Sequence, residues 1–254
     1  MARVALGERG KWRSEMHQSV LLVGLMGISG ATLSVPAFAE GDIGLMVSGS
    51  QMLTTKVSEE GLALGSERVF SGAFSLISGT WYTDEPGLQI ASGTLQPGSS
   101  LGMYFTRALR QWNGSNFDLV SGGRLSATFG PASNSIWTPL TDLNTASVIF
   151  PVAGSGGMHD HPDWVLENFD PGSDAFFFLA EARFSSNQGG LSDSLPFYIV
   201  FGLNADESEV EAMEGWVRAN LVPAPSGASL LIGMSIVSSR RRRRTRCTLG
   251  QVRT

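Results

Sequence analysis

The sequence has very little cysteine and very little lysine. Its 254 residues contain one cysteine, Cys247, which lies close to the C-terminal end. Disulfide bonds, thiolate zinc sites and cysteine nucleophiles are therefore excluded within residues 40 to 220, which contain no cysteine. Lys56 is the one lysine of that stretch, and the stretch has no glycine-rich loop followed by a lysine. A phosphate-binding loop of the nucleotide-binding type is therefore excluded as well.

Basic residues are scarce in the middle of the chain. Between Glu40 and Asn220, seven Lys and Arg stand against 21 Asp and Glu, which gives this body a net charge of −14. The other basic residues lie at the two ends of the chain. Nucleic acid and anionic membrane are poor partners for such an acidic body. The overall content of 42% hydrophobic and 16% charged residues is typical of a soluble globular protein.

Residues 1–39 have the organisation of a secretory signal peptide. Basic residues up to Arg13 precede an apolar stretch from Val20 to Leu33, and the small residues Ala37 and Ala39 follow. Signal peptidase accepts small side chains at those two positions, so we predict cleavage before Glu40. The alternative is an uncleaved membrane anchor, but the apolar stretch is shorter than the roughly 20 residues that a spanning helix needs.

Residues 221–254 place prolines, an apolar span and arginines in that order. Arginines that follow an apolar span stay on the cytoplasmic side, so the body is expected outside the inner membrane. The span is marginal for a permanent anchor, and a transient, processed anchor fits it better. An ordinary single-pass tail anchor is the alternative.

This tail resembles the PEP-CTERM sorting signal that exosortases recognise. The resemblance rests on a proline motif and an arginine cluster, formed by Val222, Pro223, Ala224, Pro225, Arg240, Arg241, Arg242, Arg243 and Arg244. Ala224 stands where Glu is common, as in the version of planctomycete-like bacteria. The resemblance implies cleavage near Pro223 to Pro225 by an exosortase, in a double-membrane bacterium that makes exopolysaccharide. It also implies release or attachment at the cell surface, with extracellular polysaccharide or other surface components as partners.

The body between the two ends has the pattern of short β-strands. Residues 40 to 220 contain 23 glycines, which indicates frequent turns. Apolar and polar residues alternate from Ala175 to Phe184, as expected for a strand with one buried face. Four other short β-rich runs cover residues 68–76, 124–129, 147–152 and 195–201. We therefore predict an all-β, antiparallel β-sandwich over residues 40–203.

Two short motifs of the body predict a turn and the start of a helix. The stretch from Trp112 to Ser115 contains Asn-Gly, which predicts a tight type I′ hairpin turn, whereas residues 101–112 fit a strand or a helix equally. Asp206 to Glu209 resembles a capping box, and apolar residues follow at spacings of three and four. The sequence therefore predicts one amphipathic helix over residues 204–220, docked on the sandwich.

His159 and His161 are the two histidines of the body. On an extended segment, side chains two residues apart point to the same side, so both imidazoles can face one ligand. Nearby carboxylates would complete a site for zinc or copper, or less favourably for calcium. We predict Asp160 and Asp163 as these ligands and keep Asp84 and Glu85 as further candidates. The alternative is that the histidines cap or hydrogen-bond a loop.

The histidine segment carries a second resemblance. His159 to Trp164, the Pro171-Gly172 turn and the aromatic strand that follows are similar to repeat domains of bacterial surface proteins called choice-of-anchor M. Most of the stretch from residue 42 to 220 looks like uncharacterised planctomycete-type PEP-CTERM proteins, on the motifs Asp84 to Gly87, Trp112 to Gly114 and Phe197 to Phe201. The resemblance implies a secreted β domain without a known activity. Ser173 and Asp174 lengthen the turn relative to that pattern.

Three functions remain for an exported body of this kind. We expect a structural or adhesive role at the cell surface or in the extracellular matrix, without enzymatic activity. The second candidate is a surface module that binds metal at the histidines or glycan at aromatic residues, namely Trp81, Tyr82, Trp112, Trp137 and Trp164. The third is a glycan hydrolase that uses two opposed carboxylates.

Overall fold

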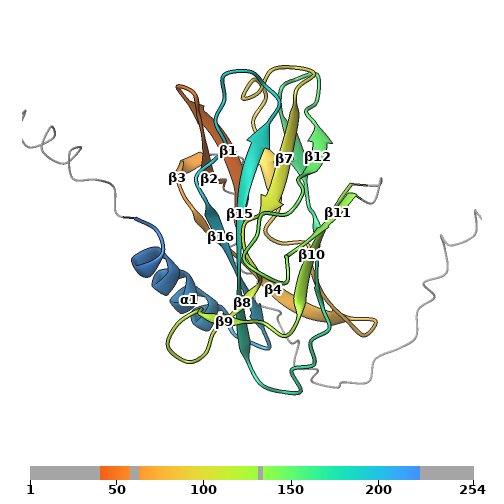
Figure 1. The fold of residues 1–254 in the computed structure, drawn as a ribbon, viewed down its shortest axis with the longest axis vertical. Helices are drawn as coiled ribbons and strands as arrows, with labels where there is room; N and C mark the ends of the chain where they lie inside the picture. The colour runs from red at the N-terminus through yellow and green to blue at the C-terminus, as the bar shows by residue number, and fades with distance from the viewer. Residues whose placement is uncertain (1–40, 58–62, 131–133, 224–254) are drawn as a thin grey trace, which may run out of the picture. The chain divides into compact units, whose positions relative to one another are not determined.

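The computed structural model describes residues 41–57, 63–130 and 134–223 (Figure 1). The predicted signal peptide, with Ala37 and Ala39, lies outside these residues, and so does the predicted sorting signal from Ala224 to Arg244. Val222 and Pro223 are the last two described residues. Within the described part of the chain, no helix is long and apolar enough to cross a membrane.

A five-stranded sheet forms one layer of the fold. Its strands, in spatial order, are β13 (Met158–Asp160), β6 (Leu88–Ile90), β1 (Asp42–Ser48), β2 (Gln51–Val57) and β3 (Ala63–Ser66). β1 and β2 form an antiparallel hairpin, whereas β1 and β6 run parallel. β6 thereby lies between the first strand of the domain and β13, which comes much later in the sequence.

A larger, eleven-stranded sheet forms the other layer. Nine strands follow one another in space: β11 (Asn134–Trp137), β10 (Arg124–Phe129), β14 (Asp163–Glu167), β5 (Thr80–Thr83), β4 (Val69–Ile77), β16 (Phe197–Leu203), β15 (Phe176–Ser186), β7 (Ser100–Phe105) and β12 (Val148–Pro151). The short strand β8 (Arg110–Gln111) pairs with β15, and β9 (Leu119–Val120) pairs with β8. The rings of Phe129 in β10 and Phe150 in β12 have centroids 4.9 Å apart, so the sheet curls until distant strands meet.

The core lies between the two layers. Ile43, Leu45 and Met52 come from the small sheet, and each is at most 4% exposed. They belong to one cluster with buried aromatic residues of the large sheet, among them Phe70, Phe105, Trp164, Phe178, Phe184 and Phe201. Burial of such large apolar side chains is the main favourable contribution to the stability of a domain without disulfides.

The central strand β16 is buried on both faces. All seven of its residues, Phe197–Leu203, are buried. One face contributes Phe197 and Phe201 to the core between the sheets, and the other contributes Tyr198 and Val200 to a second cluster beneath the helix. β16 pairs in parallel with β4, and a run without polar alternation is typical of a strand covered on both sides.

A single helix in the described residues, α1 (Glu207–Asn220), follows β16. Asp206 accepts a hydrogen bond from the Glu209 backbone N–H, and the Glu209 side chain accepts one from the Asp206 backbone N–H, each at 2.9 Å. These two bonds make the predicted capping box. The apolar side of α1 packs on β16 through Val210 and Val217.

The all-β sandwich with one C-terminal amphipathic helix is thus confirmed. Each predicted strand region contains a strand, and the ambiguous region 101–112 contains β7 and β8. Most pairings are antiparallel, but β1–β6 and β4–β16 are parallel, which the alternation pattern did not indicate. The Asn113-Gly114 turn lies inside a longer loop between β8 and β9, and only Gly114 has a positive φ, +96°, so a two-residue type I′ turn is wrong.

Candidate metal centre

His159 and His161 lie on the same side of one extended segment. His159 is the central residue of β13, opposite Gln89 of β6, and His161 comes directly after the strand. Their Nε2 atoms lie 3.1 Å apart. One ring therefore donates a hydrogen and the other accepts it, as the tautomers allow. The expected convergence of the two imidazoles is present in the structure.

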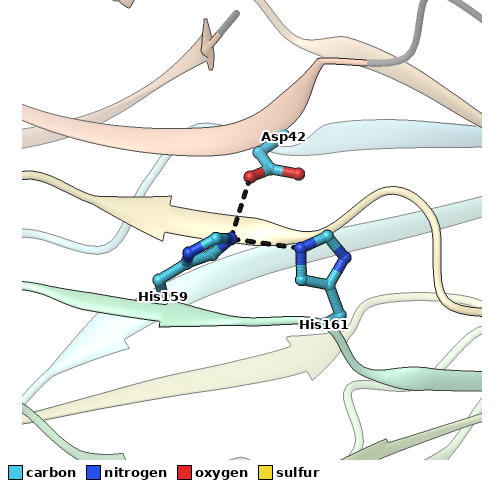
Figure 2. Close-up of side chains that lie close together, drawn as sticks. All are labelled: Asp42, His159 and His161. Carbon is cyan, nitrogen blue, oxygen red and sulfur yellow. Dashed lines mark hydrogen bonds and ion pairs between the residues drawn. The ribbon is translucent and has the colours of Figure 1, made fainter. Parts of the chain in front are cut away.

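Asp42 completes a group of three ligand atoms (Figure 2). It is the first residue of β1, and its Oδ2 lies 3.4 Å from Nε2 of His159. The carboxylate oxygen and the two imidazole nitrogens all lie within 4.8 Å of one another. The Asp42 side chain is 15% exposed, compared with 56% for His159, so the group has a sheltered side and an open side.

Glu85 holds the other nitrogen of His161. Its Oε1 lies 3.4 Å from Nδ1 of His161, which also lies 3.3 Å from the Asp84 carbonyl oxygen. The second Glu85 oxygen accepts the backbone N–H of Gly87 at 3.0 Å. Burial raises the pKa of Glu85, and the Gly87 N–H and the nearby His161 act in the opposite direction. An acceptor on Nδ1 leaves Nε2 free to bind a metal, which is the usual support for a histidine ligand.

Gly87 leaves the space that these side chains occupy. A β-carbon at this position would lie 2.5 Å from Oδ1 of Asp42 and 2.8 Å from Cε1 of His161. Neither distance is compatible with van der Waals contact. The close approach of Asp42 and His161 therefore depends on the absence of a side chain at residue 87.

Asp160 and Asp163, the carboxylates predicted from sequence, do not belong to this group of ligand atoms in the described part of the chain. Asp160 follows His159 in β13, and successive side chains of a strand point to opposite faces. Asp163 lies in β14, where its Oδ1 accepts the hydroxyl of Tyr82 at 2.9 Å. Asp42 takes the place of both, and Glu85, a further candidate, contacts the site through His161.

Two of the three separations within the group match a small transition-metal ion. Ligand atoms at about 2.0–2.1 Å from a tetrahedral zinc ion lie about 3.3 Å from one another. The separations of 3.1 Å between the histidines and 3.4 Å between His159 and Asp42 lie on either side of that value, and the separation between His161 and Asp42 is within 4.8 Å. Two imidazoles with one carboxylate suit zinc or copper better than calcium, which prefers six to eight oxygen ligands. Three protein ligands leave a fourth position for water or an outside ligand.

Neither a protein-family model nor a curated protein matches the chain. Among solved structures, the CooA pilin subunit from enterotoxigenic Escherichia coli is similar in outline, with 9% sequence identity and a TM-score of 0.32. The match covers 58% of this chain and 95% of the pilin subunit. Any functional inference therefore rests on the residues of this chain.

Proposed function

We propose that the chain is an exported structural or adhesive protein of the cell surface whose β domain binds one divalent transition-metal ion. Asp42, His159 and His161 are its ligands, with zinc or copper as the ion. The observation that carries the metal proposal is the convergence of the three ligand atoms within 4.8 Å. Glu85 fixes the orientation of His161 from outside the ligand group.

The position of the site suits a metal ion that stabilises the fold. The chain passes from the large sheet to the small one between β5 and β6, and it returns between β13 and β14. Glu85 and Gly87 lie on the first passage, and His161 lies on the second. A metal bound by Asp42 and the histidines therefore ties the start of β1 to β13 and to the second passage, and His161 contacts the first passage through Glu85. It acts as a cross-link between β1 and β13, which β6 separates, in a body without cysteine.

Export and sorting are supported by the sequence of the two ends. A signal-peptide pattern precedes the β domain, and a proline motif, an apolar span and an arginine cluster follow it. Signal peptidase and an exosortase are the partners that this order implies, with transient attachment to the inner membrane before release or anchoring at the surface. The proposal assigns no catalytic activity to the chain.

The test is metal analysis of the purified protein combined with thermal melts. The metal-free protein is titrated with zinc, copper and calcium, and a variant with His159→Ala and His161→Ala is treated in the same way. We expect one equivalent of zinc or copper and a higher melting temperature for the native chain, and neither for the double variant. Calcium should shift the melt little.

Asp160→Asn serves as the matched control, because Asp160 neighbours both histidines in sequence but lies outside the ligand group. This variant should bind metal like the native chain, whereas Asp42→Asn should lose most of the affinity. Absence of metal binding by the native chain would refute the metal part of the proposal. Equal losses in Asp160→Asn and Asp42→Asn would refute the ligand assignment.

A further inference from the structure

A second feature lies apart from the metal centre, where the β4–β5 hairpin reaches beyond the core. Leu76, Trp81 and Leu166 occupy one row across β4, β5 and β14, and Leu125 of β10 continues it. Burial falls along this row, since Leu125 is 0% exposed, Leu166 is 3% exposed and Leu76 is 58% exposed. Trp81 lies between these extremes and packs partly against the core. One side of its indole is therefore fixed by the fold and the rest is accessible.

A hollow of about 860 Å³ opens at this end of the row. Leu76, Trp81 and Leu166 form an apolar side, whereas the end of β14 contributes Glu167 and the segment that follows it contributes Asn168 and Asp170. The volume falls within the range of about 300–1,000 Å³ that is usual for small-ligand pockets.

The two carboxylates of the hollow are hydrogen-bond acceptors that are partly used. Glu167 accepts the Trp137 Nε1–H through Oε1 at 3.1 Å, and Asp170 accepts the Gly172 backbone N–H through Oδ1 at 3.3 Å. Within the described residues, the second oxygen of each carboxylate accepts no protein hydrogen bond. A purely apolar ligand would cover these oxygens without giving them a donor, which is costly.

The negative charge of the hollow disfavours one class of ligand. Its described lining contains Glu167 and Asp170 but neither Lys, Arg nor His. An anionic ligand would meet like charges without a compensating cation, so it is disfavoured. The lining suits a ligand with an apolar face for the indole and hydroxyl donors at its rim for the carboxylates. A pyranose ring has both features.

We infer that this hollow binds a neutral oligosaccharide, with Trp81 as the stacking surface and Glu167 and Asp170 as acceptors for sugar hydroxyls. The inference is independent of the metal proposal, because no lining residue of the hollow is a ligand of the metal centre. A surface protein with this site would attach to neutral polysaccharide without using its net charge.

Calorimetric titration of the purified protein tests the inference. The probes are neutral oligosaccharides of β-1,4-linked glucose, mannose and xylose, with oligogalacturonate as the acidic comparison. At least one neutral oligosaccharide should bind, and oligogalacturonate should not. Leu76→Arg should weaken binding at least tenfold, because it places a long side chain at the mouth of the hollow at a position that is already 58% exposed.

Leu140→Arg is the matched control, since Leu140 is 71% exposed and lies outside the hollow. It should bind like the native chain, as should the His159→Ala and His161→Ala double variant if it remains folded by circular dichroism. Trp81→Ala should abolish binding in a chain that still has a β-type spectrum. Failure of every neutral probe, preference for oligogalacturonate, or equal affinity in Leu76→Arg and Leu140→Arg would overturn the inference.

Discussion

A β-carbon on Gly87 would lie 2.9 Å from Nδ1 of His161, the nitrogen that faces Glu85. Gly87→Ala should therefore push His161 away from Asp42 and weaken zinc binding at least tenfold. The free energy of unfolding of the metal-free protein should change little, because His161 is 38% exposed and can move outward. Affinity is measured by competition with a chromogenic chelator, and stability by urea unfolding without metal.

Gly122→Ala is the control for this substitution, because a β-carbon at Gly122 would meet no atom within 4 Å. Its zinc affinity should equal that of the native chain. If Gly87→Ala and Gly122→Ala bind zinc equally well, the close approach around residue 87 has no part in the site.

The tyrosines should titrate above their ordinary range. Burial raises the pKa of all three, Tyr82, Tyr104 and Tyr198, and hydrogen bonds to Asp163 and Asp193 help to bring the pKa of Tyr82 and Tyr104 to about 12. The folded protein therefore keeps these protons above pH 10, where the unfolded chain releases them. The stabilising contribution is full below that pH and is lost as the pH rises towards about 12.

Near-ultraviolet absorbance of phenolate checks this expectation. The native protein should show little phenolate at pH 10.5, about half a unit above the ordinary pKa of 10, and the same chain in guanidinium should be mostly ionised there. Tyr82→Phe should leave the titration of the other two tyrosines in place. A native curve that coincides with the denatured curve would contradict the burial of these hydroxyls.

The docking of α1 depends on a glycine in β16. A β-carbon on Gly202 would lie 2.6 Å from Cγ2 of Val210. Gly202→Ala should destabilise the domain by about 1–3 kcal/mol through overpacking. Val210→Ala removes the methyl group that clashes, so the double variant should be more stable than the sum of the single effects predicts, by about 0.5 kcal/mol or more. Urea unfolding of the four proteins measures this coupling, and strict additivity would argue against it.

Sorting is tested at the arginine cluster. Replacement of Arg240 to Arg244 by glutamine should change the retention or processing of the protein in its native host, because it removes most of the positive charges that we expect to keep the tail on the cytoplasmic side. Arg253→Gln, outside the cluster, is the control and should be processed normally. Mass spectrometry of the mature C-terminus reads the outcome. Unchanged export with the same mature C-terminus after loss of the cluster would contradict the sorting proposal.

The sequence predicted the pair of histidines but not the complete group of candidate ligands. The spacing of His159 and His161 was sufficient, because side chains two residues apart share a face of any strand. The same alternation argues against Asp160, which lies between them. Asp42 gave no local signal, since β6 brings it to the site by pairing with β1 on one side and with β13 on the other. Such pairings depend on register between distant segments, which a single sequence does not display.

In the large sheet and the helix, local sequence patterns again predicted single elements but not the pairing of distant strands. The alternation from Ala175 to Phe184 predicted β15, and the capping box at Asp206 predicted the start of α1. The β-rich run over residues 195–201 predicted the strand β16, but it predicted neither the burial of both its faces nor its parallel partner β4. Trp164 was a candidate for a glycan surface, yet it is 1% exposed and donates its Nε1–H to the Pro86 carbonyl oxygen at 3.1 Å.

The parallel pair of β4 and β16 also sets the order in which the chain can fold. Val69 pairs with Tyr198, so the centre of the large sheet joins segments from the two ends of the domain. Contacts between such distant segments form slowly, because the intervening loop must close first. A chain that is made from its N-terminus therefore cannot complete the sheet before β16 has been synthesised. If the chain is exported as we propose, this delay keeps it unfolded for passage across the membrane, and the sandwich assembles on the far side.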